Sequence, residues 1–269
     1  MRLKFFSFAA AIFITFTPFK DFINNYIPIY NNYYEGLSSK ELDWYYESRK
    51  NGEVPFPPKE SKNFISNYNV YYVGDTSKKE IYLTFDEGYE NGYTERILDI
   101  LKKHNVKAAF FVVKPYIKSQ PELIKRMTEE GHLVCNHSSH HPSMAKVTNK
   151  EKFTSEFTEV EDIYKEVTGK EMPKFFRPPM GKYSELSLKM TQDLGYKTIF
   201  WSFAYNDWIP EKQPSKEYAF NKIISKTHNG AIILLHAVSK TNTDLLEDLI
   251  LKWKAEGYEM KSLEELKSN

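Results

Sequence analysis

The sequence is poor in cysteine and lacks an excess of charge of either sign. Its 269 residues contain one cysteine, Cys135, which excludes an intramolecular disulfide framework and a zinc site built from several thiolates. Lys and Arg number 37 against 36 Asp and Glu, so the basic surplus typical of nucleic-acid-binding proteins is missing. We therefore expect no nucleic-acid partner.

Long uncharged runs are also scarce, and the most prominent one lies at the start of the chain. Arg2 and Lys4 precede an uncharged stretch from Phe5 to Phe19, which is shorter than the roughly 20 residues that a spanning helix needs. A basic start followed by a short apolar stretch is typical of a secretory signal. We interpret residues 1–25 as a signal peptide or an uncleaved N-terminal membrane anchor.

The remaining composition predicts a folded domain. Hydrophobic residues make up 41% of the chain and aromatic residues 16%, enough for one large core or two modest ones. The aromatic share suits a core or a groove that stacks on sugar rings. Residues 26–78 are rich in Tyr, Asn, Ser and Pro, and we interpret them as an N-terminal arm packed on the main domain, with a helix at Ser39–Arg49.

From Val70 onward, strand-like and helix-like segments alternate. We expect strands at Val70–Val73, Ile81–Phe85, Ala108–Val113, His132–Cys135, Lys174–Arg177, Lys197–Ser202 and Ala231–Leu235. The expected helices are Tyr93–His104, Pro121–Glu130, Lys150–Thr168, Ser184–Leu194, Lys216–His228 and Asp244–Glu256. Repeated strand–helix units imply parallel strands with helices outside. The fold class is therefore α/β, a distorted (β/α) barrel of about seven to eight strands.

Polar residues follow the expected strands where each apolar run ends. They are Asp86 and Glu87, Asn136 and His137, Arg177, Asp207 and Trp208, and His236. Because functional residues of such barrels lie at the carboxyl ends of the strands, these side chains should converge on one rim. The sequence thus predicts an active site there.

His137 and His141 have a spacing that suits a metal ligand pair. An i, i+4 pair places two imidazoles on one side of a helical turn or tight loop, although the same residues are compatible with a polar surface loop. A carboxylate from Asp86 or Glu87 would complete a three-ligand set with open positions, and the alternative for these acids is a solvated turn. His140 is given no ligand role. His236 is either a catalytic group or a hydrogen-bonded core histidine.

Five ordered segments carry a resemblance to a known family. They are Thr84-Phe-Asp-Glu-Gly88, His137-Ser-Ser-His-His141, Arg177-Pro-Pro-Met-Gly181, Asp207-Trp208 and Leu234-Leu-His236. In order and spacing the chain resembles the polysaccharide deacetylases, carbohydrate esterases with a NodB homology domain, here over residues 79–267. Within that family it is most similar to the N-acetylmuramic acid deacetylases of muramic δ-lactam formation in spore cortex.

The resemblance implies a role for each matching residue. Asp86 would be the general base and His236 the general acid, with Arg177 holding Asp86 and Asp207 tuning His236. A divalent metal ion, zinc as the first expectation, would be bound by Glu87, His137 and His141. Substrate would contact Trp208, Met180, Tyr89 and Leu234, and the Met180 amide would add an oxyanion donor. Three positions depart from the family pattern: Glu87 replaces an Asp, Met180 an aromatic residue and Ala204 an acid.

The function implied is removal of the N-acetyl group from N-acetylmuramic acid in peptidoglycan, leading to muramic δ-lactam. The partners would be peptidoglycan strands whose stem peptides an amidase has removed. The protein would be an exported monomer, secreted or membrane-anchored at the cell surface or spore envelope. Two alternatives remain open: deacetylation of N-acetylglucosamine or chitooligosaccharides, and a glycan-binding protein with weakened catalysis.

Overall fold

The computed structural model describes residues 34–49 and 52–266. The segment interpreted as a signal or anchor, residues 1–25, lies outside the described residues. Contacts divide the chain into residues 1–37 and residues 38–269. In the first unit, the described part is a turn in which the Leu37 amide donates to the Tyr34 carbonyl at 3.2 Å.

An eight-stranded sheet forms the centre of the second unit, counted over the described residues. Its strands are β2 (Val70–Tyr71), β3 (Glu80–Glu87), β4 (Ala109–Val112), β5 (Leu133–Asn136), β6 (Phe175–Phe176), β8 (Lys197–Ile199), β9 (Ala231–His236) and β10 (Glu259–Met260). Their order is β10-β3-β4-β5-β6-β8-β2, and β9 also pairs with β3. Every one of these pairings is parallel.

The sheet curls back on itself, because the far end returns to β9. A parallel bridge joins Phe203 to Ile233, and an antiparallel bridge joins Val73 to Ala231. This arrangement confirms the predicted distorted (β/α) barrel. The edge strand β2 lies in the strand predicted at Val70–Val73, so the sheet begins within the range that we assigned to the arm, residues 26–78.

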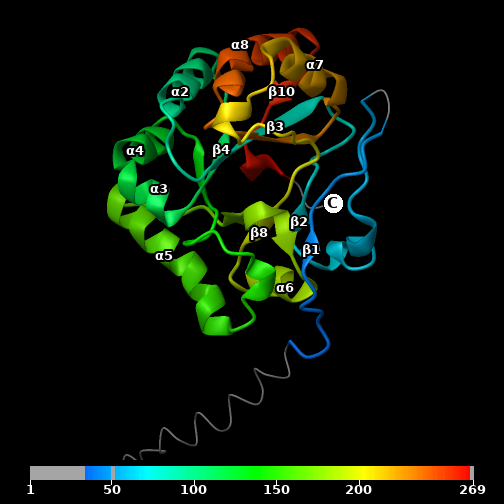
Figure 1. The fold of residues 1–269 in the computed structure, drawn as a ribbon, viewed down its shortest axis with the longest axis vertical. Coiled ribbons are helices and arrows are strands. Elements are labelled where there is room, and N and C mark those ends of the chain that lie inside the picture. The colour runs from blue at the N-terminus through cyan, green and yellow to red at the C-terminus, as the bar shows by residue number, and fades with distance from the viewer. Residues whose placement is uncertain (1–33, 50–51, 267–269) are drawn as a thin grey trace, which may run out of the picture. The chain divides into compact units, whose positions relative to one another are not determined.

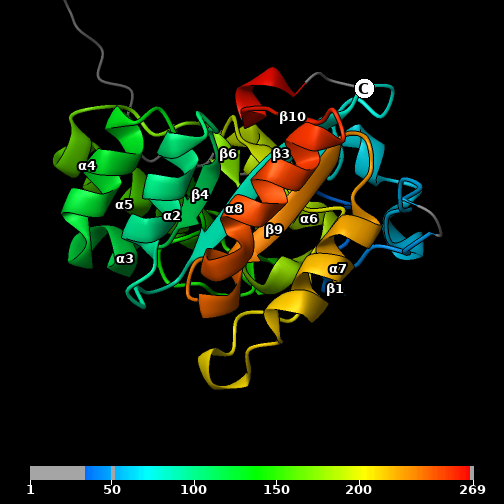
Figure 2. The same ribbon diagram turned by 90° about the horizontal axis from the view of Figure 1, so that it is seen from above.

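Helices cover the outside of the curled sheet (Figures 1 and 2). They are α2 (Thr94–Lys103), α3 (Lys114–Ser119), α4 (Pro121–Glu129), α5 (Lys150–Thr168), α6 (Glu185–Asp193), α7 (Lys216–Lys226) and α8 (Lys240–Ala255). Helix α5 has a conventional start and stop: the Asn149 side chain caps its first turn, and Gly169 ends it at φ 70°. Among the helices of the described residues, none is long and apolar enough to cross a bilayer.

Two clusters of apolar side chains form the main core. The larger lies between the sheet and the outer helices and includes Phe85, Phe110 and Trp253. The smaller, with Tyr82, Phe111 and Ile232, draws on the alternate residues of the same strands. Because successive side chains of a strand point to opposite faces, strands covered on both faces read as continuous apolar runs.

The helix predicted at Ser39–Arg49 is wrong. Leu42–Asp43 instead form strand β1, which pairs antiparallel with β7 (Lys182–Tyr183). The indole of Trp44 stacks on Phe200 with ring centroids 4.1 Å apart, and Trp44 is only 5% exposed. Strand pairing and burial of this indole override the local helix propensity of the segment.

Candidate active site

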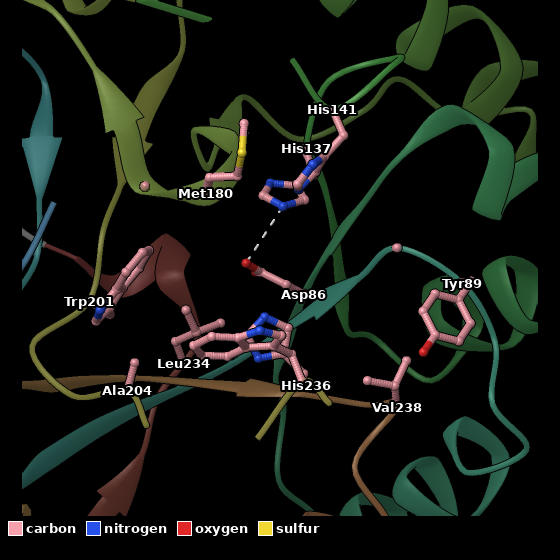
Figure 3. A pocket seen from close by; sticks show the side chains of 13 residues that line it. Asp86, Tyr89, His137, His141, Met180, Trp201, Ala204, Leu234, His236 and Val238 are labelled. Atoms are coloured by element: carbon pink, nitrogen blue, oxygen red, sulfur yellow. Dashed lines mark ion pairs between the residues drawn. The ribbon is translucent and has the colours of Figure 1, made fainter. Parts of the chain in front are cut away.

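A pocket of about 470 Å³ lies at the carboxyl ends of β3, β5 and β9. Its lining residues are Asp86, Gly88, Tyr89, His137, His141, Met180, Gly181, Trp201, Ala204, Trp208, Leu234, His236 and Val238. Figure 3 shows Asp86 near the centre, between the two histidines His137 and His141 and the ring of His236. Eight of the predicted site residues therefore meet here, and Arg177 and Asp207 lie buried behind them.

The register of the sheet places the two predicted catalytic groups side by side. Asp86 ends the buried run of β3, and His236 is its direct partner on β9. Both side chains line the same pocket. The convergence that the strand ends predicted is thus produced by parallel pairing between segments 150 residues apart.

Arg177 holds the Asp86 carboxylate. Its Nη1 donates to Asp86 Oδ1 at 2.7 Å, and its Nη2 donates to Thr84 Oγ1 at 2.9 Å. Burial alone would raise the pKa of Asp86, but the charge of Arg177, aided by that of His236, outweighs burial and lowers it. Asp86 is therefore ionised, oriented and ready to accept a proton.

The backbone carbonyl of the same arginine orients the His137 ring. His137 Nδ1 lies 2.7 Å from the Arg177 carbonyl oxygen, so Nδ1 carries the hydrogen and Nε2 presents a lone pair. Nε2 is 3.6 Å from Asp86 Oδ2, the contact that is dashed in Figure 3. Burial lowers the pKa of His137 to about 4 and lowers that of His141 as well. Both imidazoles are neutral, as metal coordination requires.

The loop after β5 brings His141 back over His137. Ser138 and His141 have φ values of 70° and 57°, a region that residues other than glycine rarely adopt. The Asn136 side chain accepts from the Ser138 amide at 2.8 Å, and Ser138 Oγ accepts from the His141 amide at 3.0 Å. The two imidazole centroids lie 4.9 Å apart. His140, given no ligand role, instead lies exposed against Glu156 at 2.9 Å.

His236 and Asp207 form a second ionic pair. Asp207 Oδ1 lies 2.7 Å from His236 Nδ1, and Oδ2 accepts from the His236 amide at 2.9 Å. Burial alone would lower the pKa of His236, but the Asp207 charge and hydrogen bond outweigh burial and raise it. A protonated His236 is therefore favoured, and its Nε2 is left available for substrate.

Asn242 supports the pair formed by His236 and Asp207, and it was not predicted from the sequence. Its Nδ2 donates to Asp207 Oδ2 at 2.6 Å and to the His236 carbonyl at 3.2 Å, and Tyr205 donates to its Oδ1. Asn242 lies in the first turn of α8, which Ser239 caps. The only available signal was its spacing, one helical turn beyond the loop that follows β9.

Glu87 is the predicted ligand that the structure does not bring to the pocket. Its neighbour Asp86 points inward, so Glu87 points to the opposite face of β3, where it is 0% exposed. Both of its carboxyl oxygens lack a hydrogen-bond partner. Burial, aided by the charges of Glu90 and Asp86, raises the pKa of Glu87 well above its usual range. Burial therefore favours the protonated, uncharged form of this carboxyl.

The donor set in the pocket thus fits two imidazole ligands, and not the three-residue set that includes Glu87. Over residues 34–49 and 52–266, no group of three or more His, Cys, Asp or Glu side chains is arranged to hold a metal ion. His137 and His141 have the neutral form and the separation that a shared ion needs. Water and substrate would supply the other coordination positions.

Aromatic and apolar side chains form the pocket walls. Tyr89, Met180 and Trp208 line it and are 52%, 54% and 51% exposed, while Leu234 lies on β9, two residues before His236. The Trp208 and His236 ring centroids are 5.6 Å apart. Tyr183, in the short strand after Gly181, is not part of these walls: it is 0% exposed and packs against Trp44. An amphipathic sugar ring fits such walls.

The comparisons with known proteins agree with this geometry. The family profile described as polysaccharide deacetylase matches residues 73–199. The chain is 44% identical over 233 residues to the peptidoglycan-N-acetylmuramic acid deacetylase PdaA of Bacillus subtilis, which covers 86% of this chain and 88% of the relative. It is 32% identical over 241 residues to a peptidoglycan-N-acetylglucosamine deacetylase of Bacillus cereus, which covers 86% and 85% of the two.

A solved structure gives the same result for the fold. The structure of Bacillus subtilis PdaA, a family 4 carbohydrate esterase, matches with a TM-score of 0.82 and 42% identity, over 86% of this chain and 98% of that chain. Sequence and fold therefore agree over the same large share of the chain. The resemblance read from the five motifs is confirmed, and the chain belongs to the polysaccharide deacetylase family.

Proposed function

We propose that this enzyme removes the N-acetyl group from N-acetylmuramic acid in peptidoglycan. The observation that carries the proposal is the pocket itself, in which Asp86, held by Arg177, and His236, held by Asp207, are direct partners on the paired strands β3 and β9. Amide hydrolysis needs one group that takes a proton from the attacking water and another that gives a proton to the departing amine. These two residues supply both.

Asp86 acts as the general base. Arg177 fixes Oδ1, which leaves Oδ2 directed into the pocket toward His137. A carboxylate held in one orientation loses little entropy when it receives the proton of the attacking water. The lowered pKa keeps Asp86 ionised across the neutral range.

His236 acts as the general acid. Because Asp207 holds Nδ1, the proton on Nε2 is the one delivered to the leaving nitrogen. The amine of a sugar is a poor leaving group unless it is protonated as the C–N bond breaks. The Trp208 ring lies beside this imidazole, with the two ring centroids 5.6 Å apart.

His137 and His141 would hold a divalent metal ion, with zinc as the first expectation from their imidazole donors. Such an ion would polarise the acetamide carbonyl and stabilise negative charge on its oxygen. Met180 lines the same pocket and has a φ of 59°, and its amide would donate to that oxygen.

N-acetylmuramic acid is the first substrate to consider, because PdaA of Bacillus subtilis, named for that activity, is 44% identical over most of both chains. The 32% identical relative from Bacillus cereus, named as an N-acetylglucosamine deacetylase, makes glucosamine units the second candidate. Peptide-free strands are the expected substrate form. Lactam closure joins the freed amine to the lactyl carboxylate, so an amidase must first remove the stem peptide.

The setting follows from the substrate. Peptidoglycan lies outside the cytoplasmic membrane, so we propose that residues 1–25 export the protein or anchor it, at the cell surface or the spore envelope. Formation of muramic δ-lactam in spore cortex is the role that we propose for the product.

Acetate release tests the proposed function. Purified protein would be incubated with peptide-free glycan strands and, separately, with chitooligosaccharides, each with and without added Zn²⁺. We expect metal-stimulated release from the glycan strands and little from the chitooligosaccharides. Release from chitooligosaccharides alone would overturn the muramic assignment. Binding to strands with no release from either substrate would leave a glycan-binding protein.

The pH profile should report the pair formed by His236 and Asp207. In Asp207→Asn the charge that raises the pKa of His236 is gone, so burial leaves that pKa below its ordinary value. His236 then loses its proton at a lower pH. The alkaline limb of the kcat profile should therefore move to lower pH by about one pH unit or more. Asn242→Ala, which keeps the Asp207 charge, is the matched control and should lower kcat with a much smaller shift. An unmoved limb in Asp207→Asn would contradict the assignment of His236 as the acid.

A further inference from the structure

Three residues of one pocket wall are held from outside by the segment that precedes the sheet. The pocket-lining residues Gly181, Trp201 and Ala204 each accept a hydrogen bond on the backbone carbonyl. Trp44 donates its amide to Gly181 at 2.7 Å and its indole Nε1 to Trp201 at 2.9 Å. Tyr46 Oη donates to Ala204 at 3.0 Å.

The donors themselves are firmly placed. Strand β1 pairs with β7 directly before Trp44, and the indole stacks on Phe200. Gly181 allows this close approach, because a Cβ there would lie 2.9 Å from Trp201 Cη2 and 3.3 Å from Trp44 Cβ. The segment and the pocket wall therefore pack as one layer.

This wall lies across the pocket from the loop that carries Tyr89. Figure 3 shows Trp201 and Ala204 on one side of Asp86 and Tyr89 and Val238 on the other. Bound sugar rings that reach Asp86 must lie between the two sides. The distance of Trp201 and Ala204 from Asp86 thus sets the width available to the substrate.

We propose that residues 38–48, through Trp44 and Tyr46, position the substrate-binding wall of the active site and so determine affinity for the glycan. The proposal rests on the proposed function for its kinetic readout. Trp44 and Tyr46 touch the backbone of wall residues and not the pocket interior, so they are positioning residues. They act through Trp201 and Ala204.

Binding should be affected more than chemistry. Asp207 follows Ala204 by three residues, but it is held separately by Asn242 and by the His236 amide. Loosening Ala204 therefore widens the pocket without releasing the acid from its partner. KM should rise while kcat and the alkaline limb stay near those of the wild type.

The neighbouring residue Tyr45 provides a matched control. Tyr45 Oη donates to Glu60 at 2.7 Å, away from the pocket, whereas Tyr46 Oη donates to the pocket wall. Tyr45→Phe and Tyr46→Phe each remove one hydroxyl and one hydrogen bond. A merely structural role would make the two variants alike.

The experiment compares both variants and Trp44→Phe in the full chain. We expect Tyr46→Phe to raise KM for peptide-free glycan strands about three- to tenfold, as loss of one hydrogen bond allows, with kcat within about twofold. Hydrogen exchange followed by mass spectrometry should show faster exchange over residues 200–208. Trp44→Phe, which keeps a ring against Phe200 but loses the indole donor, should act in the same direction, and Tyr45→Phe should do neither.

Each outcome decides between the two proposals. Exchange over residues 200–208 that matches the wild type in Tyr46→Phe overturns the positioning role, and so does faster exchange with an unchanged KM. A wild-type protein that releases no acetate overturns the proposed function instead. In that case, hydrogen exchange and the dissociation constant for the same glycan strands still test whether residues 38–48 position the pocket wall.

Discussion

Replacing Asp86 by asparagine is expected to lower kcat for acetate release about 10³-fold, within the range that a general base contributes. Asparagine keeps the shape of the side chain and an oxygen for Arg177, which donates to Asp86 at 2.7 Å, but it cannot take the proton of the attacking water. KM should change little, because the pocket walls are untouched. Initial rates on peptide-free glycan strands at saturating Zn²⁺ measure the effect.

Glu87→Gln is the matched control, one residue along the same strand. Since burial raises the pKa of Glu87 well above its usual range, the uncharged carboxyl is the favoured form, and glutamine replaces it with an uncharged group of similar size. We expect kcat/KM within about threefold of the wild type and the same Zn²⁺ requirement. A tenfold loss that excess Zn²⁺ restores would return Glu87 to the ligand set that the sequence predicted.

Much of the fold could be predicted from the sequence because local signals and packing agree. The run Ala231–Leu235 is apolar throughout, and it forms a strand that is buried on both faces. Helix α5 carries its own cap and its own stop at Gly169. Helix α3 (Lys114–Ser119) was missed, since its six residues are too few to show a helical period. The segment around Trp44 was predicted as a helix from its local sequence. Its strand partner, β7, lies about 140 residues further on, so no local signal indicated the pairing.

The site was predictable where strand ends determine it. Asp86, His137 and His236 each follow an apolar run, and parallel pairing must bring such positions to one rim. The orientation of Glu87 was harder to predict, because alternation along β3 fixes only that Asp86 and Glu87 point apart. Which of the two faces the pocket depends on the register with β4 and β9. Asn242 could not be found from motifs, since its role arises only when α8 begins beside Asp207.

Arg177→Met is expected to cost more stability than other charge removals in the described part of the chain. Arg177 is 0% exposed and donates to Asp86, Thr84 and the Ile199 carbonyl. Removing one partner of a buried ion pair costs about 3–5 kcal/mol, which corresponds to a fall in Tm of about 6–20 °C for a domain of this size. Urea unfolding and calorimetry measure both quantities.

Arg96→Met is the control for the loss of a charge pair as such. Arg96 lies 2.7 Å from Asp244, the same separation as Arg177 from Asp86, but its side chain is 56% exposed. An exposed pair contributes about 0–1 kcal/mol, so Arg96→Met should unfold close to the wild type. Equal losses in the two variants would contradict the importance of burial at Asp86.

The pH dependence separates the charge of Arg177 from its packing. The pKa of Asp86 in the folded protein is lowered, so Asp86 contributes stability that is present above the unfolded pKa of about 3.9 and is lost as pH falls through the lower folded value. In Arg177→Met the pKa of the buried Asp86 carboxyl is higher, so Asp86 becomes protonated at a higher pH than in the wild type. The difference in unfolding free energy between wild type and variant should therefore be largest near neutral pH and shrink toward pH 4. Part of it should persist, because the guanidinium also lies 4.1 Å from the centroid of the Phe111 ring. A difference that stays constant between pH 7 and pH 4 would assign the whole effect to packing. It would contradict a stabilising charge interaction between Arg177 and Asp86.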